Sequence, residues 1–134
     1  MQRMTASEYL NATPIPSESV EQQRLFQWAR MMQGKHPELE MLFKISNEGK
    51  RTRTNGARMR AEGLKKGVPD LCLPVARCGC HALYIELKKA DGGRLSTEQI
   101  EWLDKLKQQG NMAVVSHGWE PAAQIIEDYL EGRL

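Results

Sequence analysis

The sequence has no long apolar run and few cysteines. None of its apolar stretches approaches the roughly 20 residues that a membrane-spanning helix needs. The first residues, Met1 to Ala6, contain no apolar segment of the kind found in secretion signals. The three cysteines are an odd number, which argues against a disulfide framework and fits a reducing compartment. We therefore expect a soluble, cytoplasmic protein without a membrane partner.

The chain is also too short for two ordinary domains, at 134 residues. With 40% hydrophobic and 27% charged residues, its composition is that of a folded domain and not of a disordered tail. No internal repeat or low-complexity segment is present. Residues 1–16 lack periodicity and contain Pro14 and Pro16, so we expect an extended lead-in there, followed by a single domain over residues 17–134.

Charge is distributed unevenly along the chain. Of a formal net charge of +2, the stretch from Lys44 to Lys66 alone carries +6 (eight basic residues against Glu48 and Glu62), which leaves −4 for the rest. Basic blocks of this kind often bind polyanions, because Lys and Arg replace the counterions of phosphates. A solvated surface that keeps the protein soluble is the other interpretation, and charge alone does not decide between them.

Hydrophobic periodicity predicts alternating helices and strands. Helices are expected from Ser19 until Gly34 stops the pattern, weakly over residues 55–66, over residues 96–109 and from Pro121 to Leu130. Strands are expected over residues 41–46, 68–73, 82–89 and 112–116. Capping boxes are indicated at Ser19 with Gln22 and at Ser96 with Gln99. The order α-β-(α)-β-β-α-β-α predicts an α/β fold with a small mixed sheet flanked by helices.

The two central strands form a predicted β-hairpin that holds two acidic residues. If its loop is symmetric about Cys78, Asp70 faces Glu86 across the strands, and Lys88 lies on the same face. The opposite face is then wholly apolar. Two carboxylates directly opposite each other are destabilising unless one is protonated or a cation lies between them. A hard divalent ion, Mg²⁺ or Mn²⁺, suits such oxygen ligands. A slip of one residue in either strand would separate the pair onto opposite faces.

Two polar residues interrupt apolar helical faces. Glu21 shares a face with Leu25 and Trp28, and Gln99 shares one with Trp102. A polar group that faces a core is costly unless it finds a partner there. Each residue either contributes to the site on the hairpin or simply caps the first turn of its helix.

The cysteines follow one another closely in the hairpin loop, as Cys78-Gly79-Cys80-His81, with Cys72 on the adjoining strand. Structural zinc sites use wider spacing and a second pair of ligands, and no such pair follows. We therefore expect free thiols in this loop.

Several motifs together resemble those of a known nuclease group. Val68-Pro69-Asp70, fifteen residues and then Glu86-Leu87-Lys88 read as PD-X15-EXK, which is similar to the PD-(D/E)XK nuclease superfamily. Asn47-Glu48-Gly49-Lys50-Arg51, Gly67-Val68-Pro69-Asp70, Ile85-Glu86-Leu87-Lys88 and Gly93-Arg94-Leu95-Ser96 leading to Gln99 resemble its VRR-NUC branch, the virus-type replication-repair nucleases. The likeness covers about residues 18–130 and is closest to the small stand-alone phage and bacterial members. It implies a restriction-endonuclease-like core.

The resemblance implies a metal-dependent endonuclease and a role for each site residue. Asp70, Glu86, the backbone carbonyl of Leu87 and Glu21 would bind Mg²⁺ or Mn²⁺. Lys88 would orient or deprotonate the attacking water and steady charge on the phosphate. Gln99 would support the site. No nucleotide cofactor is implied.

The basic stretch then has an expected substrate. We expect the side chains of Lys50, Arg51, Arg53, Arg58, Arg60, Lys65 and Lys66 to hold the DNA backbone, which positions DNA without reading its sequence. The resemblance to dimeric Holliday-junction resolvases implies a homodimer that cleaves branched DNA in replication, recombination or repair. A flap nuclease, a sequence-directed nuclease and a non-catalytic DNA-binding module with the same fold are the alternatives.

Overall fold

The computed structural model describes residues 15–46 and 53–134, with the backbone alone for Arg53 and Thr54. Its elements are α2 (Glu18–Met31), the 3₁₀ helices η1 (Met32–Gly34) and η2 (Pro37–Met41), β1 (Phe43–Lys44), α3 (Arg53–Ala61), β2 (Leu71–Leu73), β3 (Leu83–Lys88), α4 (Thr97–Gln108), β4 (Met112–His117) and α5 (Trp119–Leu130). The predicted α/β order is therefore confirmed over these residues.

The four strands form one mixed sheet in the order β1-β2-β3-β4. The first three are antiparallel, and β3 and β4 are parallel neighbours joined by α4. The register of the hairpin is the one expected from symmetry about Cys78, with Cα partners Leu71–Ile85, Cys72–Tyr84 and Leu73–Leu83. The pairing is not shifted by one residue, so each hairpin residue lies on the face that the sequence predicts.

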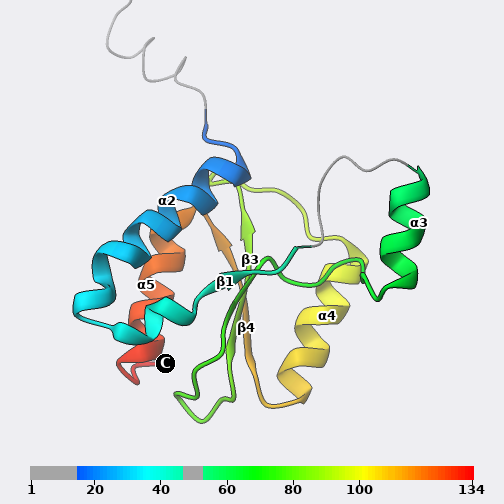
Figure 1. Cartoon of the computed structure of the whole chain (residues 1–134). Coiled ribbons are helices and arrows are strands. Elements are labelled where there is room, and N and C mark those ends of the chain that lie inside the picture. Colours follow the sequence, from blue (N-terminus) through cyan, green and yellow to red (C-terminus); the bar gives the residue numbers. More distant parts are fainter. Residues whose placement is uncertain (1–14, 47–52) are drawn as a thin grey trace, which may run out of the picture.

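Helices cover both faces of the sheet. Figure 1 shows α2 and α5 side by side on one face and α4 on the other, with α3 standing apart beyond α4. The apolar face of the hairpin packs against α2 and α5, and the main buried residues of this core are Leu25, Leu71, Leu73, Leu83, Ile85, Leu87, Ile126 and Tyr129. The opposite face, which carries the polar hairpin residues, lies toward α4.

Local chemistry explains where the predicted boundaries were wrong. Strand β1 is shorter than expected because residues up to Met41 form a 3₁₀ helix. Strand β2 begins at Leu71 and not at Val68, since Pro69 has no N–H for a ladder. Helix α2 is capped by Ser17, whose hydroxyl accepts the Val20 N–H at 3.2 Å, so the expected Ser19–Gln22 box is wrong.

Two other expectations are confirmed. Ser96 and Gln99 form the reciprocal capping box at the start of α4. Cys72, Cys78 and Cys80 are free thiols. In the part of the chain that the structure describes, no helix combines the length and apolar character that crossing a membrane requires.

Candidate active site

Asp70 is fixed at the end of the hairpin by bonds to both neighbouring strands. Its backbone carbonyl accepts the Ile45 N–H at 2.7 Å, next to β1. Its carboxylate Oδ2 accepts the Leu87 N–H of β3 at 2.8 Å. Strand β2 itself begins at Leu71, and extending its register by one pair would place Asp70 opposite Glu86. The sequence predicts the same pairing.

Glu86 and Lys88 are charged residues in an interior position on β3. Their exposed fractions are 2% and 8%. The Lys88 ammonium lies 3.6 Å from Glu86 Oε1. Burying two charges costs several kcal/mol per ion in desolvation, and a pair of this kind rarely improves stability over apolar side chains. Stability alone therefore does not explain these two residues, whereas chemistry on a charged substrate does.

Gln99 connects α4 to this pair. Its Nε2 donates to Glu86 Oε1 at 2.6 Å, and its Oε1 accepts the Ser96 N–H at 2.9 Å as the second half of the capping box. Gln99 therefore both caps the first turn of α4 and bonds to Glu86, which are the two roles that the sequence left open. The capping box fixes the amide orientation, so that the N–H is directed at the carboxylate.

Two glycines let the chain pass close to these groups. A Cβ at Gly67, whose φ is +90°, would lie 2.6 Å from the backbone carbon of Glu98, so only glycine fits against the start of α4. A Cβ at Gly93 would lie 3.6 Å from Cδ of Lys88. The loop before β2 therefore passes very close to the start of α4, whereas a Cβ at Gly93 would make only an ordinary van der Waals contact with Lys88.

A small hollow of about 100 Å³ opens beside Asp70. Asp70 and Leu87 line it from the hairpin, Lys44 and Ile45 line it at β1, and α2 contributes Glu18, Ser19 and Gln22. Sequence reasoning missed Glu18. The available signal was its place in the first turn of α2, three residues before Glu21, where either acid could have faced the site.

Glu21 has a different environment. It is buried, and its Oε2 accepts the Trp119 N–H at 2.5 Å. The N-cap of α5 is Gly118, which has no side chain to cap the helix. Glu21 therefore supplies the missing cap from α2 and ties the two helices together. It lines a separate hollow with His117 and Trp119, away from the one that Asp70 lines.

Cys72 and Tyr84 lie opposite each other two pairs further along the hairpin than Asp70 and Glu86, and therefore on the face of Glu86. Burial raises the pKa of the Cys72 thiol, and burial likewise raises the pKa of the Tyr84 hydroxyl. Neither shift makes its group a better nucleophile.

The donors at the site suit a hard divalent ion such as Mg²⁺ or Mn²⁺ better than a softer metal such as Zn²⁺. Asp70 and Glu86 offer carboxylate oxygens and Leu87 offers its carbonyl, whereas Mg²⁺ typically takes one or two carboxylates and completes its shell with water and phosphate. We also searched residues 15–46 and 53–134 for three acidic, histidine or cysteine ligand atoms that lie within 4.8 Å of one another. Asp70 does not belong to such a group, whereas His36, Glu127 and Glu131 form one. There Lys35 already provides the cation, 2.9 Å from Glu127.

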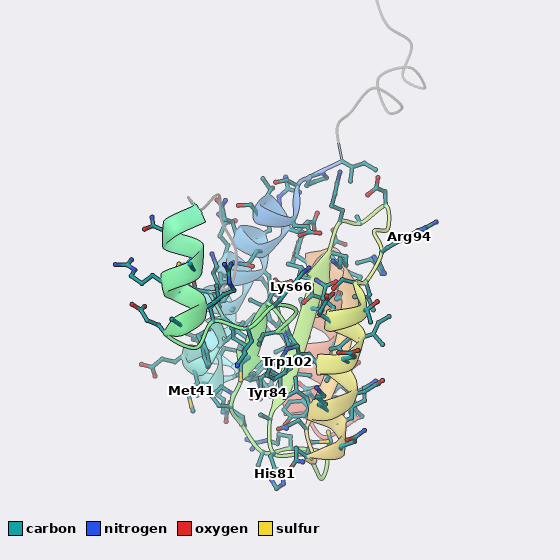
Figure 2. The ribbon with its side chains drawn as sticks, turned by 90° about the vertical axis from the view of Figure 1, so that its right-hand side faces the viewer. Met41, Lys66, His81, Tyr84, Arg94 and Trp102 are labelled. Atoms are coloured by element: carbon teal, nitrogen blue, oxygen red, sulfur yellow. The ribbon has the colours of Figure 1, made fainter. Side chains whose placement is uncertain are left out.

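Four of the seven basic residues expected to hold DNA have side chains that the structure describes, and they lie on α3 and in the loop that follows it. Arg58 and Arg60 are exposed in the last turn of α3, and Lys65 and Lys66 are exposed in the loop that follows. Figure 2 shows Lys66 between the two helices, and its ammonium lies 3.6 Å from Glu98 at the start of α4. Lys50 and Arg51 lie outside the described residues, as does the side chain of Arg53.

Comparison by sequence and comparison by structure both find similarity to VRR-NUC domains. The sequence model of the VRR-NUC domain matches residues 8–119. A solved structure described as a VRR_NUC domain protein superposes with a TM-score of 0.78 at 25% identity, covering 90% of this chain and 93% of that one. No curated protein matches the chain.

Proposed function

The chain belongs to the VRR-NUC domain family, a family of nucleases, and from this premise we propose that it is a Mg²⁺- or Mn²⁺-dependent endonuclease that hydrolyses phosphodiester bonds in branched DNA. The observation that carries the proposal is the buried Glu86–Lys88 pair, bonded by Gln99 and facing Asp70 across the hairpin. Such a group combines acidic ligands for a cation with a fixed ammonium for a phosphate.

Each residue has a role that follows from its contacts. Asp70, Glu86 and the Leu87 carbonyl would hold the ion. Glu18 of α2 lines the hollow beside Asp70 and Leu87, and it would take the place first expected of Glu21. When bound, the ion supplies positive charge to the phosphate and to the leaving oxygen. Lys88 stabilises the charge that develops on the phosphate and orients the attacking water. Gln99 holds Glu86 in one orientation.

The substrate proposal rests on the cations beside the site. Arg58, Arg60, Lys65 and Lys66 present exposed charges to phosphates without any arrangement for reading base edges. Cleavage selected by DNA shape suits such a surface, and a four-way junction is the first substrate to test. A homodimer would bring two sites to the two-fold symmetry of that junction.

The direct test is cleavage of labelled four-way junction, flap and linear duplex with Mg²⁺ or Mn²⁺, with and without EDTA. Asp70→Asn and Lys88→Met should each lower the rate about 100-fold or more, the order of loss when one stabilising group is removed from a reacting centre. Lys89→Met is the matched control, because Lys89 is exposed and adjacent and the charge change is the same.

The outcomes separate the alternatives. Metal-dependent junction cleavage that needs Asp70 and Lys88 supports the proposal. Preference for flap DNA would replace the four-way junction as the substrate, and preference for one duplex sequence would replace branched DNA as the substrate class. Tight DNA binding without cleavage in any metal would make the protein a binding module.

A further inference from the structure

A cluster of one histidine and two acids lies where the turn after α2 meets the end of α5. It consists of His36, Glu127 and Glu131, whose ligand atoms all lie within 4.8 Å of one another. Figure 1 shows the end of α5, near the C-terminus, beside the segment that follows α2. Glu18 lies at the opposite end of α2, which has 14 residues and is therefore roughly 20 Å long. The cluster is thus separate from the hollow beside Asp70.

The His36 ring is buried, but one of its nitrogens has no partner. His36 is 9% exposed, and among the described residues no group forms a hydrogen bond with its Nε2. The side chain does not cap η2, although His36 occupies the N-cap position. The backbone is fixed, since its N–H donates to the Met32 carbonyl at 2.8 Å and its carbonyl accepts the Leu39 N–H at 3.1 Å. A buried polar atom without a partner is costly, so this nitrogen requires an explanation.

This nitrogen faces two carboxylate oxygens. It lies 3.4 Å from Oε1 of Glu131 and 3.8 Å from Oε1 of Glu127. Two ligands that bind one Zn²⁺ ion at its usual bond lengths of about 2.0–2.2 Å lie roughly 3.3–3.6 Å apart in a tetrahedron. The first distance already fits this arrangement, and the second needs only a small shift of a side chain. An imidazole among the ligands favours Zn²⁺ over Mg²⁺, which prefers oxygen.

The two acids also lie where a helix favours a cation. Glu127 is in the last turn of α5, and Glu131 is its C-cap. Like charges four residues apart repel each other, and the C-terminal end of a helix carries negative partial charge. The last turn of α5 contains no basic residue. The Lys35 ammonium provides the cation instead, at 2.9 Å from Glu127 and 3.3 Å from Glu131.

A metal ion could replace this ammonium. The Lys35 side chain is 57% exposed, so it can turn into solvent. With Lys35 in place, Nε2 of His36 stays without a hydrogen bond, whereas an ion would bind the nitrogen and both acids. The Arg133 guanidinium contacts Oε2 of Glu131, which leaves Oε1 for the ion and holds the carboxylate in one orientation. Such outer contacts commonly orient metal ligands.

We propose that His36, Glu127 and Glu131 bind a first-row transition-metal ion, Zn²⁺, in exchange for the Lys35 ammonium. Three protein ligands leave a fourth position for water. The ion joins the turn after α2 to the end of α5, and it therefore stabilises the packing of the helix that carries Glu18. This site is independent of the proposed nuclease activity.

The test is titration of Asp70→Asn protein with Zn²⁺, followed by calorimetry and by thermal unfolding, so that the candidate active site lacks one of its acids. We expect one ion per chain and a thermal midpoint raised by about 5 °C or more at a saturating concentration. Adding His36→Gln should weaken Zn²⁺ binding about 100-fold or more, because losing even an outer partner of a ligand costs about 10- to 100-fold. His117→Gln is the matched control, since His117 is exposed and outside the cluster.

Two further measurements do not depend on removing a ligand. Lys35→Met should strengthen Zn²⁺ binding about two- to five-fold, the equivalent of one exposed ion pair, because it removes the competing ammonium. Lys105→Met should not change the affinity. In long-range ¹H–¹⁵N spectra, Zn²⁺ should shift the Nε2 signal of His36 and leave the ring nitrogens of His81 and His117 unchanged.

The other outcomes overturn the proposal. Zn²⁺ binding that His36→Gln leaves unchanged would exclude this site, and its loss on Cys80→Ser would place the ion at the thiols of the hairpin loop. Absence of Zn²⁺ binding would make the cluster an ion pair of Lys35 alone. An affinity that Lys35→Met leaves unchanged would mean that the ion does not take the place of the ammonium. Cleavage of DNA has no part in these results, so they do not decide the nuclease proposal.

Discussion

The side chain of Gln99 makes two hydrogen bonds that serve different purposes, one for the helix and one for Glu86. Gln99→Glu keeps an oxygen for the Ser96 N–H but places a second carboxylate against Glu86. We expect cleavage to fall about 10- to 100-fold, the usual effect of losing a supporting hydrogen bond beside a metal ligand. Cleavage rates and thermal unfolding, measured together, check this. Gln108→Glu, in the last turn of α4, controls for the added charge and should leave the rate unchanged.

Glu18 and Glu21 should differ in what their loss affects. Glu21→Gln removes the charge from the buried cap of α5, and we expect it to lower the free energy of unfolding by roughly 1–2 kcal/mol. Glu18→Gln should leave stability nearly unchanged and lower the cleavage rate about ten-fold or more, because Glu18 lines the hollow with Asp70. Denaturant unfolding and cleavage kinetics of both variants give the comparison. A loss of activity without a loss of stability in Glu21→Gln would restore Glu21 as the ligand.

The contrast between these acids shows how far the sequence alone reaches. The pairing of Asp70 with Glu86 was predictable because side chains alternate along strands and one hairpin face is wholly apolar. The choice between Glu18 and Glu21 was not, because residues three apart share a helix face. Which of them meets the hairpin depends on where α5 packs, and the distant Trp119 N–H determines that Glu21 is used as a cap.

Helix α4 is positioned by its contact with the loop before β2. Gly67→Ala would drive a Cβ into Glu98 and Gln99 while forcing alanine into a left-handed conformation. We expect a loss of roughly 2–4 kcal/mol in the free energy of unfolding, from overpacking and backbone strain together. Cleavage should also fall, because the displaced helix carries Gln99 away from Glu86.

Gly63→Ala is the control for strain without a clash. Gly63 has a φ of +108° but nothing within 4 Å of the added Cβ, so we expect a loss of only roughly 1–2 kcal/mol and unchanged cleavage. Equal losses for the two variants, measured by denaturant unfolding, would mean that the contact with Glu98 does not position α4.

Acid should weaken the whole fold through the end of α5. The hydrogen bond from Lys35 lowers the pKa of Glu127, and the hydrogen bond from Arg133 lowers the pKa of Asp128. Because both folded pKa values lie below the unfolded ones of about 4, these groups add stability at neutral pH and lose it as the pH falls through the folded values. Thermal midpoints from pH 7 to about pH 3 should therefore decline at the acidic end.

Lys35→Met removes the ion pairs of Lys35 with Glu127 and Glu131, and it identifies the share of that decline that these two pairs carry. The variant should have a lower midpoint at neutral pH and a shallower decline in acid, and the effect should be small because the Lys35 side chain is 57% exposed. Lys105→Met, an exposed lysine on α4, should keep the original slope. Parallel curves for all three proteins would exclude these ion pairs as a source of acid sensitivity.

The uneven charge of the molecule predicts DNA binding that weakens steeply with salt. Affinity of Asp70→Asn protein for junction DNA, measured by fluorescence anisotropy at several salt concentrations, should fall linearly on logarithmic axes. Removing Arg58 or Lys66 should reduce the slope by roughly 0.9 each if each contacts one phosphate. Lys105→Met provides the comparison away from the loop between α3 and α4. If neither substitution changes the dependence of affinity on salt, the DNA does not contact Arg58 or Lys66.

The bond between Glu21 and Trp119 also has a consequence for how the molecule folds. Glu86, Lys88 and Gln99 belong to the continuous unit β3-α4-β4, which assembles from short-range contacts. Glu18 is carried by α2, whose neighbour α5 lies about 100 residues later in the chain, and closing so large a loop is slow. We therefore expect α2 to dock late during folding. It is also the element whose brief release would switch the site off while the sheet stays intact, and amide hydrogen exchange would detect this as faster exchange in α2 than in β3.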